Sequence, residues 1–342
     1  KDEKSVLHRL VRYRNREYLR IILRDFHLGV EQEYITAEIS DLTGALFRGV
    51  YSLNARKHPN TLTEQSVLAF GKWGAKELNY SSDIDITFVK PNNSNDSLDR
   101  ENKSFLRLLS SYTAYGQLFR VDTTLRPYGQ QGSLVATEDH YLNYYESEAH
   151  GWEMQIWLKA KSVAGDLSLG HRVIDTMKQK LLSKDPEWVF NSVKSLRIKV
   201  LERIRRADEE ELEVKSSKWG IRTIEFWAQR ENIKLGALEE LSGNTIHILK
   251  VLSQRGVLDA AKYKELYHAY TWLRRVEHIL QLHEMQQRHC LPTSKEGRTS
   301  IAIHMGYVQK LKVSPLEQFE TELKQVKSKV VEYHKILFPD LS

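Results

Sequence analysis

The sequence has 342 residues, with 51 lysines and arginines against 45 aspartates and glutamates and a formal net charge of +6. This length predicts roughly two domains. The mean hydropathy is −0.51, and no uncharged apolar run approaches the roughly 18 residues that a membrane span needs. The single cysteine excludes a disulfide framework and any multi-thiolate zinc or iron–sulfur site within the chain. We therefore expect a cytoplasmic protein with no membrane partner.

The small positive excess does not by itself indicate a nucleic-acid partner. Basic residues are interspersed with acidic ones, as in the segment RIRRADEEELEVK at 203–215, and such mixtures are typical of solvated helix faces. We expect no nucleic-acid partner for this reason. The sequence begins with Lys1 rather than methionine, so we also expect a piece of a longer protein.

The apolar pattern of the first third changes from helical to strand-like spacing. Apolar residues at helical intervals predict two helices over 5–55, separated by a break at Gly29. A polar loop follows, and then come short runs in which apolar and polar residues alternate, bounded by turn residues. The expected elements are a strand at 66–70, a strand at 83–90, a helix at about 102–117 and a short β-like run at 119–127.

From about residue 136 onward the pattern is helical again. Long amphipathic helices are expected over 184–213 and over 236–285, the latter broken near Gly243 and Gly256. The last helix is expected to begin at Ser314-Pro315, since serine is a good N-cap and proline suits the first helical position. Its apolar stripe steps by three and four, which predicts a packing seam in a helical bundle; it consists of Leu316, Phe319, Leu323, Val326, Val330, Tyr333 and Leu337.

Two aspartates inside the second strand are the first candidate for chemistry. Side chains alternate faces along a strand, so Asp83 and Asp85 are expected to share one face while Ile84 points to the other. Two adjacent carboxylates repel each other unless a cation lies between them, and Mg²⁺ takes oxygen ligands and bridges carboxylates to substrate phosphates. The motif alone is weak, because a bare DxD is more often the polar side of a half-exposed strand.

The residues around the two aspartates strengthen the prediction. Gly71-Lys72-Trp73-Gly74 and then Ser81-Ser82 precede them; glycines let backbone N–H groups approach a phosphate, and serine hydroxyls add donors. Downstream, Arg120-Val121-Asp122 places a third carboxylate on another β-like run, with Arg126 just beyond it. Such parts build a polymerase-β-type nucleotidyltransferase site, where two metal ions activate the attacking oxygen and neutralise charge on the phosphate and leaving group.

We therefore predict an α+β, mostly helical fold with a small mixed sheet. The expected domains are a helical lead-in at 1–55, a nucleotidyltransferase core at 56–180 and a helical bundle at 181–342.

Several segments, in this order, resemble the glutamate–ammonia-ligase (glutamine synthetase) adenylyltransferase family, and the likeness covers nearly the whole chain. They are GKWGAKELNYSSDIDITFV, RVDTTLRPYGQQGSLV, WEMQIWLKAKSVAGD, WGIRTIEFWAQ and YTWLRRVEHILQLHEMQQRHCLP.

The resemblance implies an enzyme that adds AMP to a tyrosine of glutamine synthetase or removes it. Family members carry two homologous halves. The amino-terminal half uses phosphate to release ADP from the modified tyrosine, and the carboxy-terminal half transfers AMP from ATP. This chain is long enough for one half and looks more like the amino-terminal one. The likeness also implies Mg²⁺, with Mn²⁺ as an alternative ion, ATP, ADP or phosphate as substrate, and regulation involving a PII signal protein.

By resemblance, Asp83 and Asp85 would be shared metal ligands, and Asp122 a third carboxylate near the nucleophile. Phosphate would be bound by a set of loop residues and one arginine, comprising Gly71, Lys72, Gly74, Ser81, Ser82 and Arg126. Instead of binding phosphate, Arg126 would form a structural ion pair in the alternative interpretation. Lys72 would instead be a solvated lysine on the loop surface. Glu225, in the segment GIRTIEF, would lie near the active site without being one of its ligands, or else take part in packing or an ion pair.

The sequence also departs from the family pattern. The usual GKLGG is GKWGA here, so Trp73 is bulkier and Ala75 lacks the conformational freedom of glycine. Trp219 likewise places a bulky aromatic side chain just before the GIRTIEF segment, where the family has a small or aliphatic residue. Two alternatives to the enzyme therefore remain: a degenerate regulatory half that binds nucleotide or glutamine synthetase without turnover, and a nucleotidyltransferase acting on RNA or a small molecule.

Overall fold

A computed structural model describes residues 3–94, 97–282 and 289–341 of the chain. By contacts between Cα atoms the chain forms two compact units, neither of them continuous in sequence. The first unit comprises Lys1–Leu23 with Tyr34–Asp185, and the second comprises Arg24–Glu33 with Pro186–Ser342. Each unit is described by itself.

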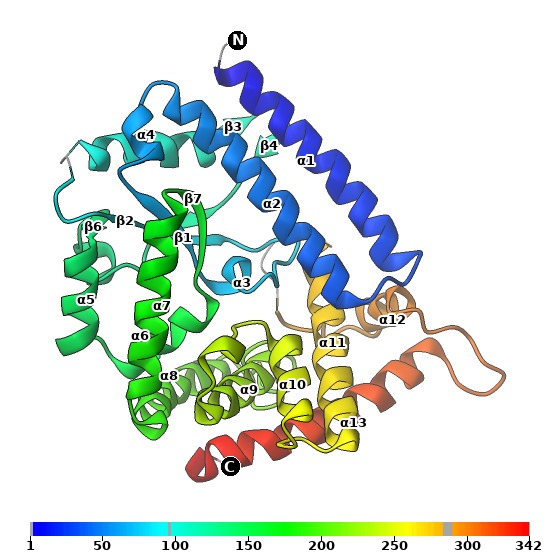
Figure 1. The fold of residues 1–342 in the computed structure, drawn as a ribbon. Helices are drawn as coiled ribbons and strands as arrows, with labels where there is room; N and C mark the ends of the chain where they lie inside the picture. Colours follow the sequence, from blue (N-terminus) through cyan, green and yellow to red (C-terminus); the bar gives the residue numbers. More distant parts are fainter. Residues whose placement is uncertain (1–2, 95–96, 283–288, 342) are drawn as a thin grey trace. The chain divides into compact units, whose positions relative to one another are not determined.

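The two opening helices confirm the prediction for 5–55. They are α1 (Glu3–Phe26) and α2 (Gln32–Ala55), drawn in blue in Figure 1. Gly29 lies between them with a φ of +61°, a left-handed conformation that glycine adopts without steric penalty. The predicted break is therefore correct.

The centre of the first unit is a small mixed sheet in the order β5-β2-β1-β7 (Figure 1). Its β1 strand is antiparallel to both β2 and β7, whereas β2 is parallel to β5 at its start and to β6 at its end. Helix α7 packs against β1 and β7. The strands are β1 (Ser66–Ala69), β2 (Ile84–Lys90), β5 (Val121–Asp122), β6 (Val135–Thr137) and β7 (Lys161–Gly165).

The remaining elements of the first unit are short apart from two helices, α4 and α7. They are η1 (Pro59–Leu62), α3 (Gly71–Gly74), α4 (Leu98–Leu109), β3 (Tyr112–Thr113), β4 (Gly116–Gln117), η2 (Gly129–Gln131), α5 (Glu138–Ser147), α6 (Gly151–Gln155), η3 (Ile156–Lys159) and α7 (Leu167–Ser183).

The helix predicted at about 102–117 is displaced. Helix α4 begins earlier and ends at Leu109, and the hairpin β3–β4 occupies 112–117. The turn explains the change: Gly116 has a φ of +102°, and the Thr113 hydroxyl accepts the N–H of Tyr115 at 3.1 Å and donates to the carbonyl of Gly116. A threonine side chain that bonds the local backbone competes with helix formation.

The prediction of helix from about 136 onward is wrong for strand β7. This strand lies against β1, and its middle residues Ser162, Val163 and Ala164 are all buried. A strand covered on both faces shows no alternation of apolar and polar residues. The period that identified β2 is therefore missing from β7.

The second unit is helical. Its elements are α8 (Pro186–Arg206), α9 (Ile221–Leu235), η4 (Leu238–Glu240), α10 (Thr245–Gln254), α11 (Ala260–Leu282), α12 (Lys295–His304), α13 (Pro315–Leu337) and η5 (Pro339–Leu341). The helices expected in 184–213 and 236–285 are present as α8, α10 and α11, with α10 and α11 flanking the Gly256 break, but residues 207–213 and 236–244 are not α-helical. Residues 283–285 of the predicted range lie outside the described residues.

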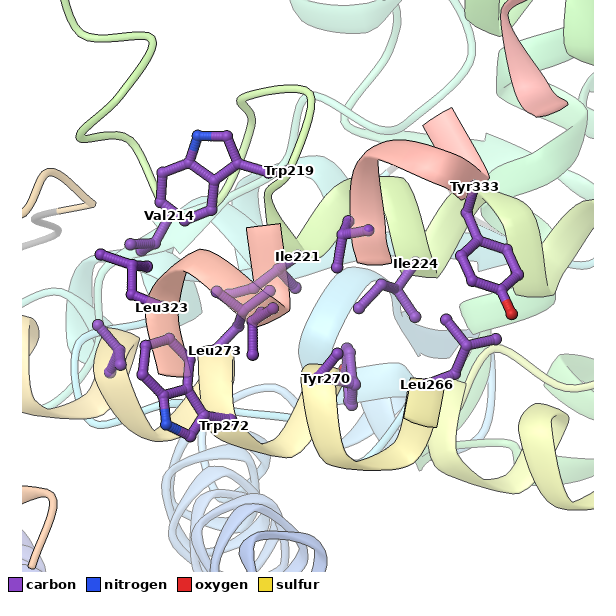
Figure 2. Close-up of a cluster of buried hydrophobic side chains, with 14 of the residues drawn as sticks. Val214, Trp219, Ile221, Ile224, Leu266, Tyr270, Trp272, Leu273, Leu323 and Tyr333 are labelled. Carbon is purple, nitrogen blue, oxygen red and sulfur yellow. The ribbon is translucent and has the colours of Figure 1, made fainter. Parts of the chain in front are cut away.

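Helix α13 begins where the sequence predicts. Ser314 caps it in a capping box with Glu317, and Pro315 is its first residue. The predicted stripe faces the core of the second unit, where Phe319 stacks on Trp272 at 5.4 Å between ring centroids and Tyr333 meets Trp227 at 4.9 Å. Figure 2 shows part of this core, including Leu323 and Tyr333. The packing seam is confirmed, and the α+β, mostly helical fold class with it.

We predict that the second unit loses stability in acid through His334. This side chain is fully buried on α13, and among the described residues neither ring nitrogen has a hydrogen-bond partner. Burial, with Arg197 and Lys218 adding repulsion, lowers the pKa of His334 to about 4. Between that value and the unfolded pKa of about 6.5, the unfolded chain binds a proton that the folded chain does not. The free energy of unfolding therefore falls as the pH falls through this window.

Urea unfolding between pH 7 and pH 4 measures the effect. His334→Phe should flatten the dependence on pH, whereas His304→Phe on the exposed face of α12 should leave it unchanged. If the free energy of unfolding depended equally on pH in the wild type and in His334→Phe, the assignment to His334 would be wrong.

No helix in the described part of the chain is long and apolar enough to cross a membrane.

Candidate active site

Two of the predicted aspartates lie side by side on neighbouring strands. In the parallel pairing of β2 with β5, Asp85 is the register partner of Asp122. Such strands are about 4.8 Å apart and paired side chains project to the same face. The Asp122 carboxylate also accepts the N–H of Thr124 at 2.7 Å, which fixes its orientation. The structure therefore brings Asp85 and Asp122 together at the start of β2.

Asp83 is turned toward an arginine that the sequence analysis did not assign. It precedes the first residue of β2, and its carboxylate accepts a hydrogen bond from Arg120 Nε at 2.5 Å. Arg120 also donates to the carbonyl and the hydroxyl of Ser81. Both charged side chains are well exposed, at 45% for Arg120 and 39% for Asp83. The Asp83 carboxylate is thus held by Arg120.

The carboxylates match the way in which Mg²⁺ is held in phosphate-transfer sites. Among residues 3–94, 97–282 and 289–341, no three His, Cys, Asp or Glu side chains are close enough to hold a metal ion by themselves. Mg²⁺ is commonly bound through one or two carboxylates, with substrate phosphates and waters completing its octahedron. Asp85 and Asp122 would supply two such ligands from adjacent strands. This donor set fits Mg²⁺ or Mn²⁺ bound together with a phosphate.

Gly71 lies directly against the aspartate pair. Its φ is +56°, and a Cβ atom placed there would come within 2.1 Å of Asp85 Oδ2. Both facts exclude a side chain at this position. The predicted glycine is therefore required, because it lets the chain pass beside the Asp85 carboxylate.

The second glycine of the loop serves packing. A Cβ atom on Gly74 would lie 1.7 Å from the carbonyl oxygen of Lys159, so this glycine permits a close backbone approach.

Trp73 points into the core and meets Phe47 at 4.9 Å between ring centroids. Ala75 has a φ of −81°, which any residue adopts. The departures at Trp73 and Ala75 therefore leave the loop backbone unstrained at these positions.

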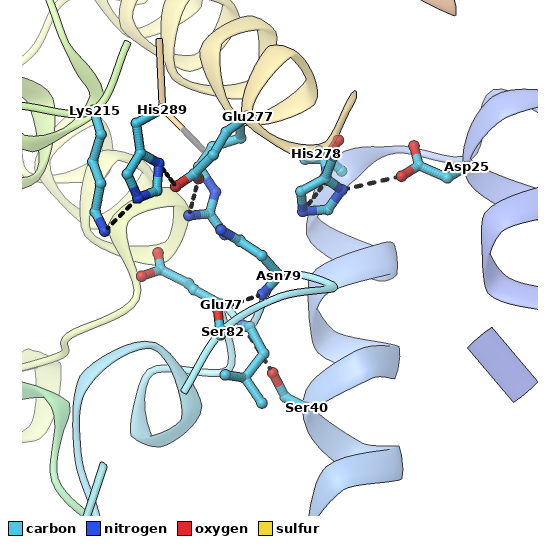
Figure 3. A network of polar contacts seen from close by, with 12 residues as sticks. Asp25, Ser40, Glu77, Asn79, Ser82, Lys215, Glu277, His278 and His289 are labelled. Atoms are coloured by element: carbon cyan, nitrogen blue, oxygen red, sulfur yellow. Dashed lines mark hydrogen bonds and ion pairs between the residues drawn. The ribbon is translucent and has the colours of Figure 1, made fainter. Parts of the chain in front are cut away.

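The loop from 77 to 82 is held by its own Ser82 side chain and by side chains of other elements, among them Ser40 of α2 (Figure 3). The N–H of Asn79 donates to the Ser82 hydroxyl at 3.1 Å, and that of Leu78 donates to Ser40 at 3.2 Å. Glu77 is buried and forms an ion pair with Lys159 at 3.3 Å. Ser82 thus shapes this loop, just before the aspartates.

Arg126 is engaged by the loop that follows β5. Its guanidinium donates to three carbonyls, those of Thr123, Gln130 and Gly132, and to the Thr123 hydroxyl. These contacts give Arg126 a role in holding the loop, and binding phosphate would require it to release some of them. Lys72 is half-buried in α3.

Glu225 belongs to the second unit, on α9, where it is 9% exposed. Its charge acts on Lys215, whose pKa is lowered mainly by burial while Glu277 and Glu225 oppose that shift.

The polar core of this unit is drawn in Figure 3. His289 lies between Lys215 at 3.3 Å and Glu277 at 3.4 Å, and His278 bonds Asp25 at 3.1 Å. Burial lowers the pKa of His278, against the raising effect of Asp25.

Arg120 was missed, although a signal for it exists. It stands two positions before Asp122, so period two places both on one face of the same run. Arg14 was missed for a different reason, because it acts across more than 100 residues: its guanidinium donates to the carbonyls of Gln117 and Leu118. Helical periodicity along α1 gives no indication of that contact.

We predict that Arg120→Lys lowers turnover far more than stability. Lysine keeps the charge but not the planar fork that bridges Asp83 and Ser81. An exposed ion pair contributes less than about 1 kcal/mol to stability, whereas a misplaced catalytic group can reduce turnover roughly 100-fold. Arg172→Lys is the matched control, since Arg172 makes a similar two-bond pair with Glu138 on α5. If both variants keep normal turnover, Arg120 does not position the site.

Comparisons with known proteins assign the chain to a family. The family model for glutamate–ammonia ligase adenylyltransferase matches residues 1–175, a span that holds all three aspartates. The chain belongs to the glutamate–ammonia ligase adenylyltransferase family. This confirms the resemblance drawn from its motifs. The GlnD PII-uridylyltransferase model matches residues 194–338, in the helical second unit.

Curated relatives carry the name bifunctional glutamine synthetase adenylyltransferase/adenylyl-removing enzyme. The one from Nitrosococcus oceani is 31% identical over 96% of this chain and 36% of its own length. The relative from Hahella chejuensis is 32% identical over 89% of this chain and 34% of its own length. The relative from Streptomyces avermitilis is 32% identical over 94% of this chain and 33% of its own length. The chain therefore spans about a third of the length of these relatives.

Proposed function

We propose that this member of the glutamate–ammonia ligase adenylyltransferase family is a Mg²⁺-dependent enzyme that controls adenylylation of a tyrosine of glutamine synthetase. The proposed reaction is phosphorolytic removal of AMP, with transfer of AMP from ATP as the opposite sense. The pairing of Asp85 with Asp122 beside Gly71 carries the proposal. The relatives are named for both reactions, and their name identifies glutamine synthetase as the proposed substrate.

In the proposed removal reaction, an oxygen of inorganic phosphate attacks the phosphorus of the AMP–tyrosine ester. A new P–O bond forms, giving ADP, and the bond to the tyrosine oxygen breaks. The proton carried by the attacking phosphate passes to the tyrosine oxygen as it leaves. Charge therefore builds up on the transferred phosphoryl group and on the leaving oxygen, and these are the places that the site must stabilise.

The side chains near the aspartates have separate proposed tasks. Asp85 and Asp122 would hold the metal ion, which, when bound, neutralises charge on the transferred phosphoryl group. Asp122, fixed by the N–H of Thr124, would orient the attacking oxygen. Asp83 would join the ligands in the substrate complex, and Arg120 would set its position. Gly71 keeps side chains away from the metal ligands. We take the small sheet with its three aspartates to be a polymerase-β-type nucleotidyltransferase core.

The direction of the reaction is proposed from three segments. The opening helices, RVD before LRP, and RRVEHILQ before LP are more like the amino-terminal half of the family. We therefore favour removal of AMP, with a PII signal protein as a proposed regulatory partner. The match of residues 194–338 to a model named for PII uridylylation supports that partner.

One experiment tests both activity and direction. The chain is incubated with adenylylated or unmodified glutamine synthetase, Mg²⁺, and either phosphate or ATP, and AMP on the tyrosine is followed by mass. ADP that appears only with phosphate identifies removal. A mass gain of one AMP from ATP identifies transfer. If neither product forms, the enzyme proposal is wrong and the non-catalytic alternative takes its place.

The non-catalytic alternative rested on the altered GKWGA loop. That argument is weak, because Ala75 has an ordinary φ and Trp73 fills the core. A nucleotidyltransferase acting on RNA or a small molecule is the other alternative, and activity on such substrates but not on glutamine synthetase would support it.

A further inference from the structure

A basic surface lies on the first unit, formed by α1 and the β3–β4 hairpin. It surrounds a shallow depression of about 350 Å³. None of the described residues lining the depression is acidic, and four of them are basic. The lining consists of Lys4, Ser5, His8, Arg9, Arg12 and Tyr115. We call these residues the α1–hairpin surface.

The side chains of this surface are arranged rather than scattered. The Arg12 guanidinium lies over the Tyr115 ring, 5.3 Å from its centroid, and His8 meets the same ring edge-on at 6.0 Å. A guanidinium stacked on a ring keeps its N–H groups in one plane and available at the rim. Such a planar fork matches a carboxylate with two parallel hydrogen bonds.

The hairpin that carries Tyr115 is fixed to α1. Arg14 donates to the carbonyls of Gln117 and Leu118, and Asn15 donates to the carbonyl of Tyr115 at 3.1 Å. Helix α1 and the hairpin therefore meet in a defined geometry. The hairpin also exposes Tyr112, whose side chain is 83% accessible.

Neighbouring carboxylates do not neutralise the surface. On the part of α1 that belongs to the first unit, the described acidic residues are Glu3 and Glu17. Glu3 is paired with Lys57 at 2.8 Å, and Glu17 with Arg16 and Arg20. The positive charge of Lys4, Arg9 and Arg12 is therefore available to a partner.

The surface is close to the candidate active site. Tyr115 is seven residues before Asp122, and seven extended residues span at most about 25 Å. A standard protein interface covers about 800 Å² per partner, which corresponds to a patch about 30 Å across. An interface of this width that extends from the aspartate pair toward the hairpin can therefore include the α1–hairpin surface.

We propose that the α1–hairpin surface docks a carboxylate-bearing segment of the protein substrate. This proposal rests on the proposed function, since it concerns the partner of the same site. An acidic protein segment fits better than RNA, because the basic side chains form a compact cluster rather than a long stripe. The Tyr115 ring is also already covered by Arg12, which leaves less of it for base stacking.

The test measures binding of glutamine synthetase without turnover, in the absence of phosphate and nucleotide. Arg9→Glu with Arg12→Glu should weaken binding at least tenfold and flatten its dependence on salt. The matched control, Arg203→Glu with Arg205→Glu, makes the same charge change on exposed positions of α8 and should leave affinity unchanged. Arg9→Lys with Arg12→Lys keeps the charge without the fork and should have an intermediate effect. Circular dichroism checks that each variant is folded.

Two outcomes would overturn the docking proposal. One is equal affinity of the wild type and the double glutamate variant; the other is loss of affinity for a poly(U) probe with full affinity for glutamine synthetase. Failure of the proposed function looks different, because neither ADP release nor AMP gain would then be found even where binding is normal. Binding that is sensitive to Arg9 and Arg12 would support the docking surface in either case.

Discussion

Asp122→Asn should lower turnover by two to three orders of magnitude while leaving the protein folded. Asparagine has nearly the same shape, and its side-chain oxygen can still accept the N–H of Thr124, which the Asp122 carboxylate accepts at 2.7 Å. Its charge is lost, and with it one of two adjacent ligands for a cation. Losing one preorganised electrostatic group typically lowers turnover roughly 10²–10³-fold. Asp85→Asn should behave in the same way.

The measurement is AMP removal or transfer under saturating Mg²⁺, together with thermal unfolding. Asp175→Asn, at an exposed position on α7, is the control for removing a carboxylate from the same unit. Near-normal turnover in Asp122→Asn would show that the reaction takes place elsewhere. A large drop in melting temperature would instead assign Asp122 a structural role.

Gly71→Ala should also abolish most turnover, through displacement of Asp85. The new Cβ atom would lie 2.1 Å from Asp85 Oδ2, so the carboxylate or the backbone has to move. A φ of +56° adds about 1–2 kcal/mol of strain for an L-residue. Since a displacement of about 1 Å can reduce catalysis roughly 100-fold, we expect an effect on turnover of at least that size.

Gly29→Ala separates strain from displacement. Gly29 has nearly the same φ, +61°, but no atom within 4 Å of an added Cβ. It should therefore lose about 1–2 kcal/mol of unfolding free energy and keep its turnover. If Gly71→Ala resembled Gly29→Ala in both measurements, the position of Asp85 would not matter for the reaction.

The parts of the site that could be predicted from sequence are those governed by local periodicity. Alternation in a strand identified β2, and the DxD pattern with a later strand aspartate identified the pair formed by Asp85 and Asp122. Strand β7 could not be found in this way, because it is covered on both faces. The contact of Arg14 with the β4 strand depends on tertiary structure, which no local pattern encodes.

One expectation about the loop depended on a backbone angle that the sequence does not reveal. Ala75 in place of glycine matters only if that residue needs a positive φ. The positive angle falls instead on the next residue, Lys76, with a φ of 58°. The sequence pattern identified a conformationally unusual turn but not the residue that adopts the unusual conformation.

The second unit takes part of its buried interior from the turn between α1 and α2. Asp25 and Gln32, both within Arg24–Glu33, bond His278 on α11, about 250 positions later. A recombinant protein that starts at Pro186 would leave this buried histidine without either partner, at a cost of about 1–3 kcal/mol for each unsatisfied buried group. Expression of the helical unit by itself therefore calls for a circularly permuted or fused chain that supplies the missing decapeptide.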